Sequence, residues 1–265
     1  ACKILYRVYE KKDSKDGFVS IEIDPKFARD TEKSIKEGIY LYESINQPNV
    51  MIKVPGTIEG QPVIEELISM GINVNVTLLF SRKMYCESAV SYIKGLKKIN
   101  KNQVNIKNVN SVASFFISRI DTEVDKIIDN EYKGKIAIYN AIKAYEDYEK
   151  IFSDKDFKDL EKLGANPQKL LWASTSVKNP DYEKLLYVEN LLAPETVNTV
   201  PEDVYNEIIN NVNDYKSFLD EEIVDLISES SISEKDFESI TDNLLSVGIR
   251  LFEEAFDSLI AELEK

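Results

Sequence analysis

Short runs of β-branched and apolar residues recur along the chain, and each run has the length of one strand. Between the runs, apolar positions lie three and four residues apart, which is the period of an amphipathic helix. This alternation of strand and helix predicts an α/β fold, rather than an all-β or an all-α protein. The six predicted strands are Phe18–Ile23, Val50–Val54, Val74–Phe80, Ser111–Ser118, Lys169–Ser174 and Thr196–Val200.

Two of the intervening helices have clear start and stop signals. Thr57 is suited to cap the first helix, and Gly71 stands where a glycine commonly follows a helix end. Ser81 is suited to cap the second helix. The predicted inner faces are Val63, Ile64, Leu67 and Ile68 in the first helix, and Tyr85, Ala89, Tyr92 and Leu96 in the second.

The order of elements leaves two architectures, an open doubly wound sheet and a closed (β/α)₈ barrel, which both place function at the carboxyl ends of the strands. Gly56 and Gly60 do not have the spacing of a dinucleotide-binding turn, so we expect the barrel type. A barrel needs eight strands, and the chain opens on an apparent helix end at Ile4–Tyr9, so about two βα units would be missing before it. The segments 120–167 and 201–265 are longer than simple connections and should hold additional helices.

Composition supports one domain over residues 1–265, because 43% of the residues are apolar and 30% are charged. No apolar run is long enough to span a membrane, so we expect a soluble, cytoplasmic protein without a membrane partner. Histidine is absent, and Cys2 and Cys86 are the only cysteines. These absences exclude histidine triads and imidazole metal sites, and they leave carboxylates, lysine, tyrosine and hydroxyl groups for catalysis.

The net charge of −14 comes from the C-terminal part of the chain. Residues 201–265 hold 18 acidic and 4 basic residues, whereas residues 1–200 hold 29 of each. This predicts an acidic helical segment at about 201–265 and argues against nucleic acid as a partner. Between Glu87 and Asp121 the charges are all basic, but the many asparagines there indicate a Lys/Asn-rich surface loop rather than a nucleic-acid patch.

Lys53 stands in an otherwise apolar strand, immediately before a Pro-Gly turn. Desolvation can lower the pKa of such a lysine by up to about 3–5 units, which supplies the neutral amine that attacks a carbonyl to form a Schiff base. The alternative is a lysine whose stem lies on apolar surface while its ammonium reaches water. The position of Lys53 alone leaves both interpretations open.

Other polar residues accompany Lys53 on neighbouring strands. Glu22 lies among apolar residues, where a carboxylate is either an acid–base group or the buried partner of a cation. Asn73, Asn75 and Thr77 share one face of their strand at period two. Ser114, Phe116 and Ser118 alternate in the same way, and Arg119, Ser174 and Lys178 could bind a phosphate near the strand ends or be ordinary surface residues.

These segments resemble transaldolase. The likeness is carried by 49–57 (Asn-Val-Met-Ile-Lys-Val-Pro-Gly-Thr), 71–81, 111–125 and 171–175, with 16–22 matching the third strand of the family, 195–201 its eighth strand, and 248–263 its C-terminal end. The related fructose 6-phosphate aldolases typically carry glutamine and tyrosine at the positions of Glu22 and Phe116. This chain has the transaldolase pair of residues.

The resemblance implies a (β/α)₈ TIM barrel of transaldolase type, of which about six βα units are present. The implied activity is transfer of a dihydroxyacetone unit from a ketose phosphate, sedoheptulose 7-phosphate or fructose 6-phosphate, to an aldose phosphate, in the non-oxidative pentose phosphate pathway. No metal or organic cofactor is implied. The implied catalytic residues are Lys53 as Schiff-base nucleophile and Glu22 with Thr77 on a proton-relaying water, and the implied substrate-binding residues are Asn75, Ser114, Phe116, Arg119, Ser174 and Lys178.

The chain departs from the family pattern at its N-terminus. The family's first strand carries an aspartate that acts on the donor C4 hydroxyl, and we find no counterpart here, so the expected form is a truncated or incompletely represented transaldolase with impaired cleavage. The alternative is a non-catalytic sugar-phosphate-binding or interaction protein on the same fold. The unpaired barrel edges would then invite a second copy of the chain or a separate N-terminal segment.

Overall fold

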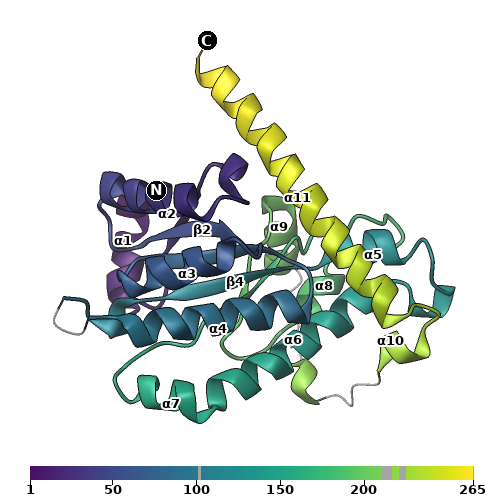
Figure 1. Cartoon of the computed structure of the whole chain (residues 1–265). Helices are drawn as coiled ribbons and strands as arrows, with labels where there is room; N and C mark the ends of the chain where they lie inside the picture. Colours follow the sequence, from purple (N-terminus) through teal and green to yellow (C-terminus); the bar gives the residue numbers. More distant parts are fainter. Residues whose placement is uncertain (101–102, 211–216, 221–224, 265) are drawn as a thin grey trace.

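The computed structural model describes residues 1–100, 103–210, 217–220 and 225–264. Six parallel strands form one sheet, and each strand pairs with the next one along the chain. Sequential parallel pairing produces a curved half-barrel, which confirms the α/β prediction with about six βα units (Figure 1). The strands are β1 (Val19–Glu22), β2 (Val50–Pro55), β3 (Asn73–Leu79), β4 (Ser111–Phe116), β5 (Lys169–Ala173) and β6 (Val197–Asn198).

All six strands lie where the hydrophobic pattern predicts them, but β6 is shorter than its predicted run. Within the described residues, β1 and β6 each pair on one side only. β6 has two residues and is the shorter of these two strands, since β1 has four. β2, β3 and β4 lie inside the sheet and are almost entirely buried.

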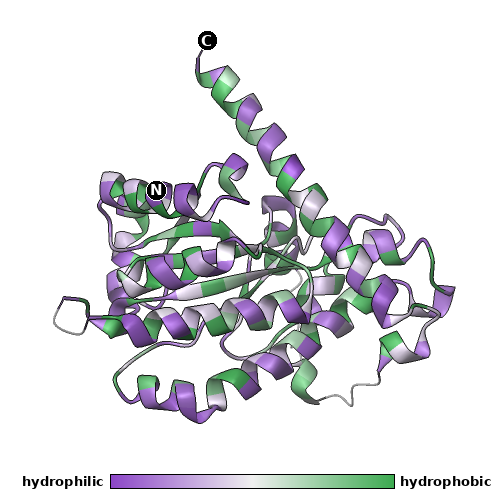
Figure 2. Cartoon of the chain, viewed as in Figure 1, coloured by the Kyte–Doolittle hydropathy of each residue, from purple (hydrophilic) through white to green (hydrophobic). Residues whose placement is uncertain are grey.

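Helices cover the convex side of the sheet (Figure 1). Along these helices hydrophobic and hydrophilic residues alternate, as expected for helices with one face on a core (Figure 2). The helices α2 (Thr31–Ile45), α3 (Gly60–Ser69) and α4 (Arg82–Lys98) contact the strands, and α6 (Ile136–Ser153) and α7 (Lys155–Glu161) pack against α4. The remaining elements are α1 (Cys2–Lys11), η1 (Pro25–Phe27), η2 (Ile106–Asn108), α5 (Ser118–Val124), η3 (Asn130–Tyr132), α8 (Leu186–Glu189), α9 (Glu202–Asn210), η4 (Phe218–Asp220), α10 (Leu226–Glu229) and α11 (Glu234–Leu263).

The predicted helix signals are present at the ends of α3 and α4. Gly71 follows α3 with a φ of +82°, in the left-handed region that suits glycine. The Ser81 hydroxyl accepts a hydrogen bond from the backbone N–H of Met84 and so caps α4. Thr57 does not occupy the N-cap position that the sequence predicts for it. Its hydroxyl accepts a hydrogen bond from the N–H of Gly60 at 2.9 Å, but the regular helix begins only at Gly60, after Glu59. All eight predicted inner-face residues are buried.

The basic stretch before Asp121 is less of a loop than expected. Lys97 and Lys98 belong to the last turn of α4 and form ion pairs with Asp156 and Glu65, respectively. Lys101 lies outside the described residues. Amphipathic periodicity continues through the lysines, so this part of the predicted surface loop is helix.

The C-terminal helix α11 packs on the half-barrel through its first half. Its buried residues Phe237, Thr241, Leu244 and Gly248 follow one another at spacings of three and four, so they form one face. Gly248 permits a close approach, because a Cβ there would lie 2.9 Å from a methyl group of Leu78. The last turns of α11 are largely exposed and project away from the rest of the molecule (Figure 1). None of the described helices has the length and hydropathy needed to cross a membrane.

Candidate active site

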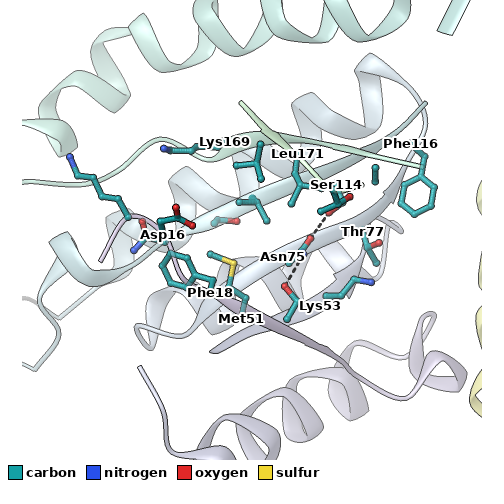
Figure 3. A pocket seen from close by; sticks show the side chains of 18 of the residues that line it. Asp16, Phe18, Met51, Lys53, Asn75, Thr77, Ser114, Phe116, Lys169 and Leu171 are labelled. Atoms are coloured by element: carbon teal, nitrogen blue, oxygen red, sulfur yellow. Dashed lines mark hydrogen bonds between the residues drawn. The ribbon is translucent and has the colours of Figure 1, made fainter. Parts of the chain in front are cut away.

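The concave side of the sheet lines a cavity of about 600 Å³ (Figure 3). Its wall is built from alternate residues of the strands, because successive side chains of a strand point to opposite faces. On β2, for example, Met51 and Lys53 face the cavity, whereas Ile52 and Val54 are fully buried on the helix side. Six of the nine predicted site residues line this cavity: Lys53, Asn75, Thr77, Ser114, Phe116 and Ser174.

Lys53 and Glu22 form an ion pair across two neighbouring strands. The register of β1 and β2 sets the two residues side by side, and Lys53 Nζ donates to Glu22 Oε2 at 3.2 Å. The two side chains are 22% and 20% exposed, respectively. Burial raises the pKa of Glu22, although the charge and the hydrogen bond of Lys53 act to lower it. Glu22 is therefore a largely buried carboxyl group with a raised pKa that lies next to an amine.

Asn75 is the centre of a hydrogen-bonded row across three strands. Ser114 Oγ donates to Asn75 Oδ1 at 2.7 Å, and Asn75 Nδ2 donates to Ser20 Oγ at 3.0 Å (Figure 3). The two bonds fix which way the amide points, since its oxygen accepts and its nitrogen donates. Asn75 thereby presents a defined polar group to the cavity.

Thr77 Oγ1 is buried and makes no hydrogen bond to any described residue. Buried hydroxyl groups normally have a partner, so this one is a notable exception. Thr77 and Lys53 lie at the same end of the cavity, together with Phe116 (Figure 3). Thr77 therefore brings an unsatisfied hydroxyl close to an amine, although its oxygen has almost no solvent-accessible area.

Two further residues shape this end of the cavity. Phe116 is 8% exposed and packs on Phe80, with ring centroids 5.2 Å apart, so it forms an apolar wall. Ser174 adopts a φ of +55°, which is uncommon for a residue other than glycine. Its hydroxyl lies 3.0 Å from that of Ser118, and its backbone carbonyl accepts from the N–H of Ser118.

Arg119 and Lys178 do not line the cavity. Arg119 is the second residue of α5, is partly exposed, and has no ion pair or side-chain hydrogen bond with the described residues. Lys178 is exposed and donates to Ser176 Oγ at 2.7 Å. It lines a separate pocket of about 160 Å³ with Asp121 and Tyr187. The alternation of residues along a strand could not predict whether Arg119 and Lys178 line the cavity, because both residues lie beyond a strand end.

Asn73 is also not part of the site. It shares a strand with Asn75 and Thr77, as predicted, but its amide donates to the carbonyl groups of Pro48 and Val50. Its side-chain oxygen accepts from the backbone N–H of Asn110 at 2.9 Å. The amide of Asn73 therefore links backbone segments and is satisfied without a ligand.

Phe252 is a contact that the sequence did not reveal. Its ring centroid lies 5.2 Å from Lys53 Nζ, within the range of a cation–π interaction. Phe252 follows Gly248 by one helical turn and continues the packed face of α11. The periodicity of α11 signals a packed residue here, but it does not signal that the residue lies beside Lys53.

A second lysine lies at the other end of the same cavity. Lys169 begins β5, and Figure 3 shows it with Asp16, away from Lys53. Lys169 Nζ forms an ion pair with Glu195 at 2.8 Å. Of the three lysines that line the cavity, Lys15, Lys53 and Lys169, only Lys53 is paired with Glu22.

Comparisons with known proteins show the family to which the chain is similar. The model of the Transaldolase/Fructose-6-phosphate aldolase family matches residues 1–263. A transaldolase of Trichodesmium erythraeum is 41% identical over 290 aligned positions, which cover the whole of this chain and 75% of that protein. Transaldolase 2 of Nostoc punctiforme is 40% identical over 100% of this chain and 74% of its own length, and a transaldolase of Mycobacterium tuberculosis is 39% identical over 99% and 73%.

A half-barrel of six parallel strands, each paired with the next along the chain, is consistent with a partial TIM barrel. The chain belongs to the Transaldolase/Fructose-6-phosphate aldolase family. It spans about three quarters of the length of these relatives.

Proposed function

We propose that the protein is a transaldolase, which transfers a dihydroxyacetone unit from a ketose phosphate to an aldose phosphate through a Schiff base on Lys53. The observation that carries the proposal is the pairing of Lys53 with Glu22 at 3.2 Å, because Lys53 also lines the cavity together with Asn75 and Thr77. The names of the relatives support the same activity. Sedoheptulose 7-phosphate and fructose 6-phosphate are the proposed donors, and the proposed setting is the non-oxidative pentose phosphate pathway.

Lys53 is the nucleophile in this proposal. Its neutral amine adds to the ketone carbon of the donor, and the carbinolamine then loses water to give a protonated imine. Cleavage of the C3–C4 bond needs a base that takes the proton of the C4 hydroxyl, the role of the family's first-strand aspartate. The electron pair of the C3–C4 bond then moves into the imine, which leaves a neutral enamine on Lys53 and releases the first aldose. The enamine carbon then attacks the aldehyde of the second aldose, and hydrolysis of the new imine restores the amine.

Glu22 and Thr77 are proposed to move the protons of these steps. Addition and loss of water require a group that first accepts and then donates a proton close to Lys53. The raised pKa of Glu22 suits both roles, and the unpartnered hydroxyl of Thr77 is suited to hold the water.

The remaining site residues are proposed to bind the substrate. Asn75 and Ser114 would position the donor hydroxyl groups, because their mutual hydrogen bond fixes their orientation. Phe116 would form the apolar wall beside the reacting carbons. Ser174 and Arg119 would bind the phosphate, with Arg119 turning from its partly exposed position toward the substrate. Lys178 is a weaker candidate for this role, since it already donates to Ser176.

Imine trapping tests the proposal. The protein is incubated with fructose 6-phosphate and sodium borohydride, and the adduct is located by peptide mass spectrometry. Imine formation precedes carbon–carbon cleavage, so it does not depend on the base that the family's first strand supplies. We expect the adduct on Lys53, its loss in Lys53→Met, and its retention in Lys169→Met, because Lys169 lies in the same cavity but is paired with Glu195.

Two outcomes would contradict the proposal. An adduct on a lysine other than Lys53 would reject the assigned nucleophile. Phosphate-dependent binding of fructose 6-phosphate without any adduct would instead support a non-catalytic sugar-phosphate-binding protein. Transfer to an aldose phosphate is then measured separately, since an adduct reports imine formation and not turnover.

A further inference from the structure

Asp121 is a buried carboxyl group that the proposed mechanism does not use. It lies in α5 and is 1% exposed. Its Oδ1 accepts from the backbone N–H of Ala137 in α6 at 2.8 Å, and its Oδ2 accepts from the hydroxyl of Tyr187 in α8 at 3.0 Å. A buried carboxyl group is costly unless it is bonded in this way, so the contacts of Asp121 hold three helices together.

A second aspartate repeats this arrangement one helical turn later. Asp125 Oδ2 accepts from the hydroxyl of Tyr182 at 2.7 Å, and its Oδ1 accepts from the backbone N–H of Gly134. Gly134 has a φ of +75°, and a Cβ there would lie 3.0 Å from the ring of Tyr182. Two tyrosines of the segment that follows β5 are therefore bonded to two aspartates, Asp121 in α5 and Asp125 at its C-terminal cap.

The same two segments carry the proposed phosphate-binding residues. Ser174 begins the segment that follows β5, and Arg119 lies two residues before Asp121 on α5. Ser118 connects the two segments, since its backbone N–H donates to the Ser174 carbonyl and its hydroxyl lies 3.0 Å from the Ser174 hydroxyl. These bonds form a junction between α5 and the segment after β5. Ser118 and Ser174 join the two segments near the cavity, and the Asp121–Tyr187 and Asp125–Tyr182 bonds join them farther away.

Ser174 needs such support because of its backbone. A φ of +55° is unfavourable for serine and persists only where the surrounding structure enforces it. The next residue, Thr175, is buried and donates to the backbone carbonyl of Thr199 and to Asn198 Oδ1, which secures one side of the turn. The segment then returns to α5 at Tyr182 and Tyr187, and these bonds secure the other side.

We propose that Asp121 and Tyr187 are positioning residues for the phosphate end of the substrate: their hydrogen bond sets α5 against the segment after β5, and so sets Arg119 and Ser174 relative to each other. This inference rests on the proposed function. It assigns Asp121 and Tyr187 no contact with the substrate and no proton transfer. Loss of the bond should weaken the binding of phosphorylated donors and leave imine chemistry at Lys53 intact.

Tyr187→Phe tests the inference with little change in shape, because only the hydroxyl that donates to Asp121 is removed. Tyr139→Phe is the matched control, since the Tyr139 hydroxyl donates to Asp225 at 2.7 Å, in a tyrosine–aspartate bond outside this junction. Borohydride trapping on the full chain is measured against the concentration of two probes, fructose 6-phosphate and unphosphorylated dihydroxyacetone.

We expect Tyr187→Phe to raise the half-saturating concentration of fructose 6-phosphate about three- to tenfold, the range for the loss of one hydrogen bond. The half-saturating concentration of dihydroxyacetone should change less than twofold. The adduct yield at saturation with either probe should also change less than twofold. Tyr139→Phe should match the wild type.

An unchanged half-saturating concentration of fructose 6-phosphate in Tyr187→Phe would overturn the inference. An equal increase for both probes would also overturn it, because the bond would then support the whole cavity and not the phosphate end. Absence of an adduct on the wild-type protein with both probes would instead reject the proposed function, and the inference with it.

Discussion

The stability of the protein should depend on pH through Asp121. Burial and the nearby charge of Asp125 together raise the pKa of Asp121 to about 7, although the hydrogen bonds from the Ala137 N–H and the Tyr187 hydroxyl oppose the shift. In the unfolded chain an aspartate ionises near its ordinary pKa of about 3.9. As pH rises between these values, the unfolded state releases a proton that the folded state retains, so the free energy of unfolding falls.

The size of the effect follows from the shift. Each pH unit between the two pKa values lowers the free energy of unfolding by about 1.4 kcal/mol. The contribution of Asp121 is therefore complete below about pH 4, and it has fallen by on the order of 4 kcal/mol at pH 7. Between pH 5 and pH 8, Asp121 should therefore lower the free energy of unfolding by about 3 kcal/mol. Asp121→Asn keeps the shape of the side chain and cannot ionise, so this variant should lack that part of the pH dependence.

Urea denaturation of the wild type and of Asp121→Asn at pH 5 and pH 8 measures the effect, because other titrating groups are common to both proteins. Relative to the wild type, the free energy of unfolding of Asp121→Asn should rise by about 3 kcal/mol between pH 5 and pH 8. Asp159→Asn is the control, because Asp159 is exposed and paired with Lys162 at 2.8 Å. A constant stability difference between Asp121→Asn and the wild type at the two pH values would refute the assignment of a raised pKa to Asp121.

Two further predictions concern the cavity. Ser114→Ala should lower the free energy of unfolding by about 1–3 kcal/mol, because the buried Asn75 Oδ1 loses its donor; unchanged urea stability would show that the Ser114 bond is dispensable. Phe252→Leu removes the aromatic face near Lys53 Nζ and should increase acylation of Lys53 by acetic anhydride about threefold, the equivalent of an exposed cation–π contact. Peptide mass spectrometry compares this variant with Phe256→Leu on the same helix, and equal labelling of Lys53 in the two would contradict a shielding role.

The sequence determined the order and type of the main elements. Strand runs and helix stripes are local patterns, so the six strands and the inner faces of α3 and α4 could be read directly from residue spacing. The same spacing placed Lys53, Asn75 and Thr77 on the concave face, because alternate residues of a strand share a face. The pairing of Lys53 with Glu22 needed the register of β1 against β2, which no single strand contains.

Only the tertiary structure decided what lies beyond the strand ends. Loop and helix-start residues have no fixed period, so their pattern could not separate Ser174, which lines the cavity, from Arg119 and Lys178, which do not. The bonds between Asp121 and Tyr187, and the approach of Phe252 to Lys53, join residues 66 and 199 positions apart in the chain. Such contacts depend on how whole elements pack, which is why local sequence rules predict the strands better than the surroundings of the site.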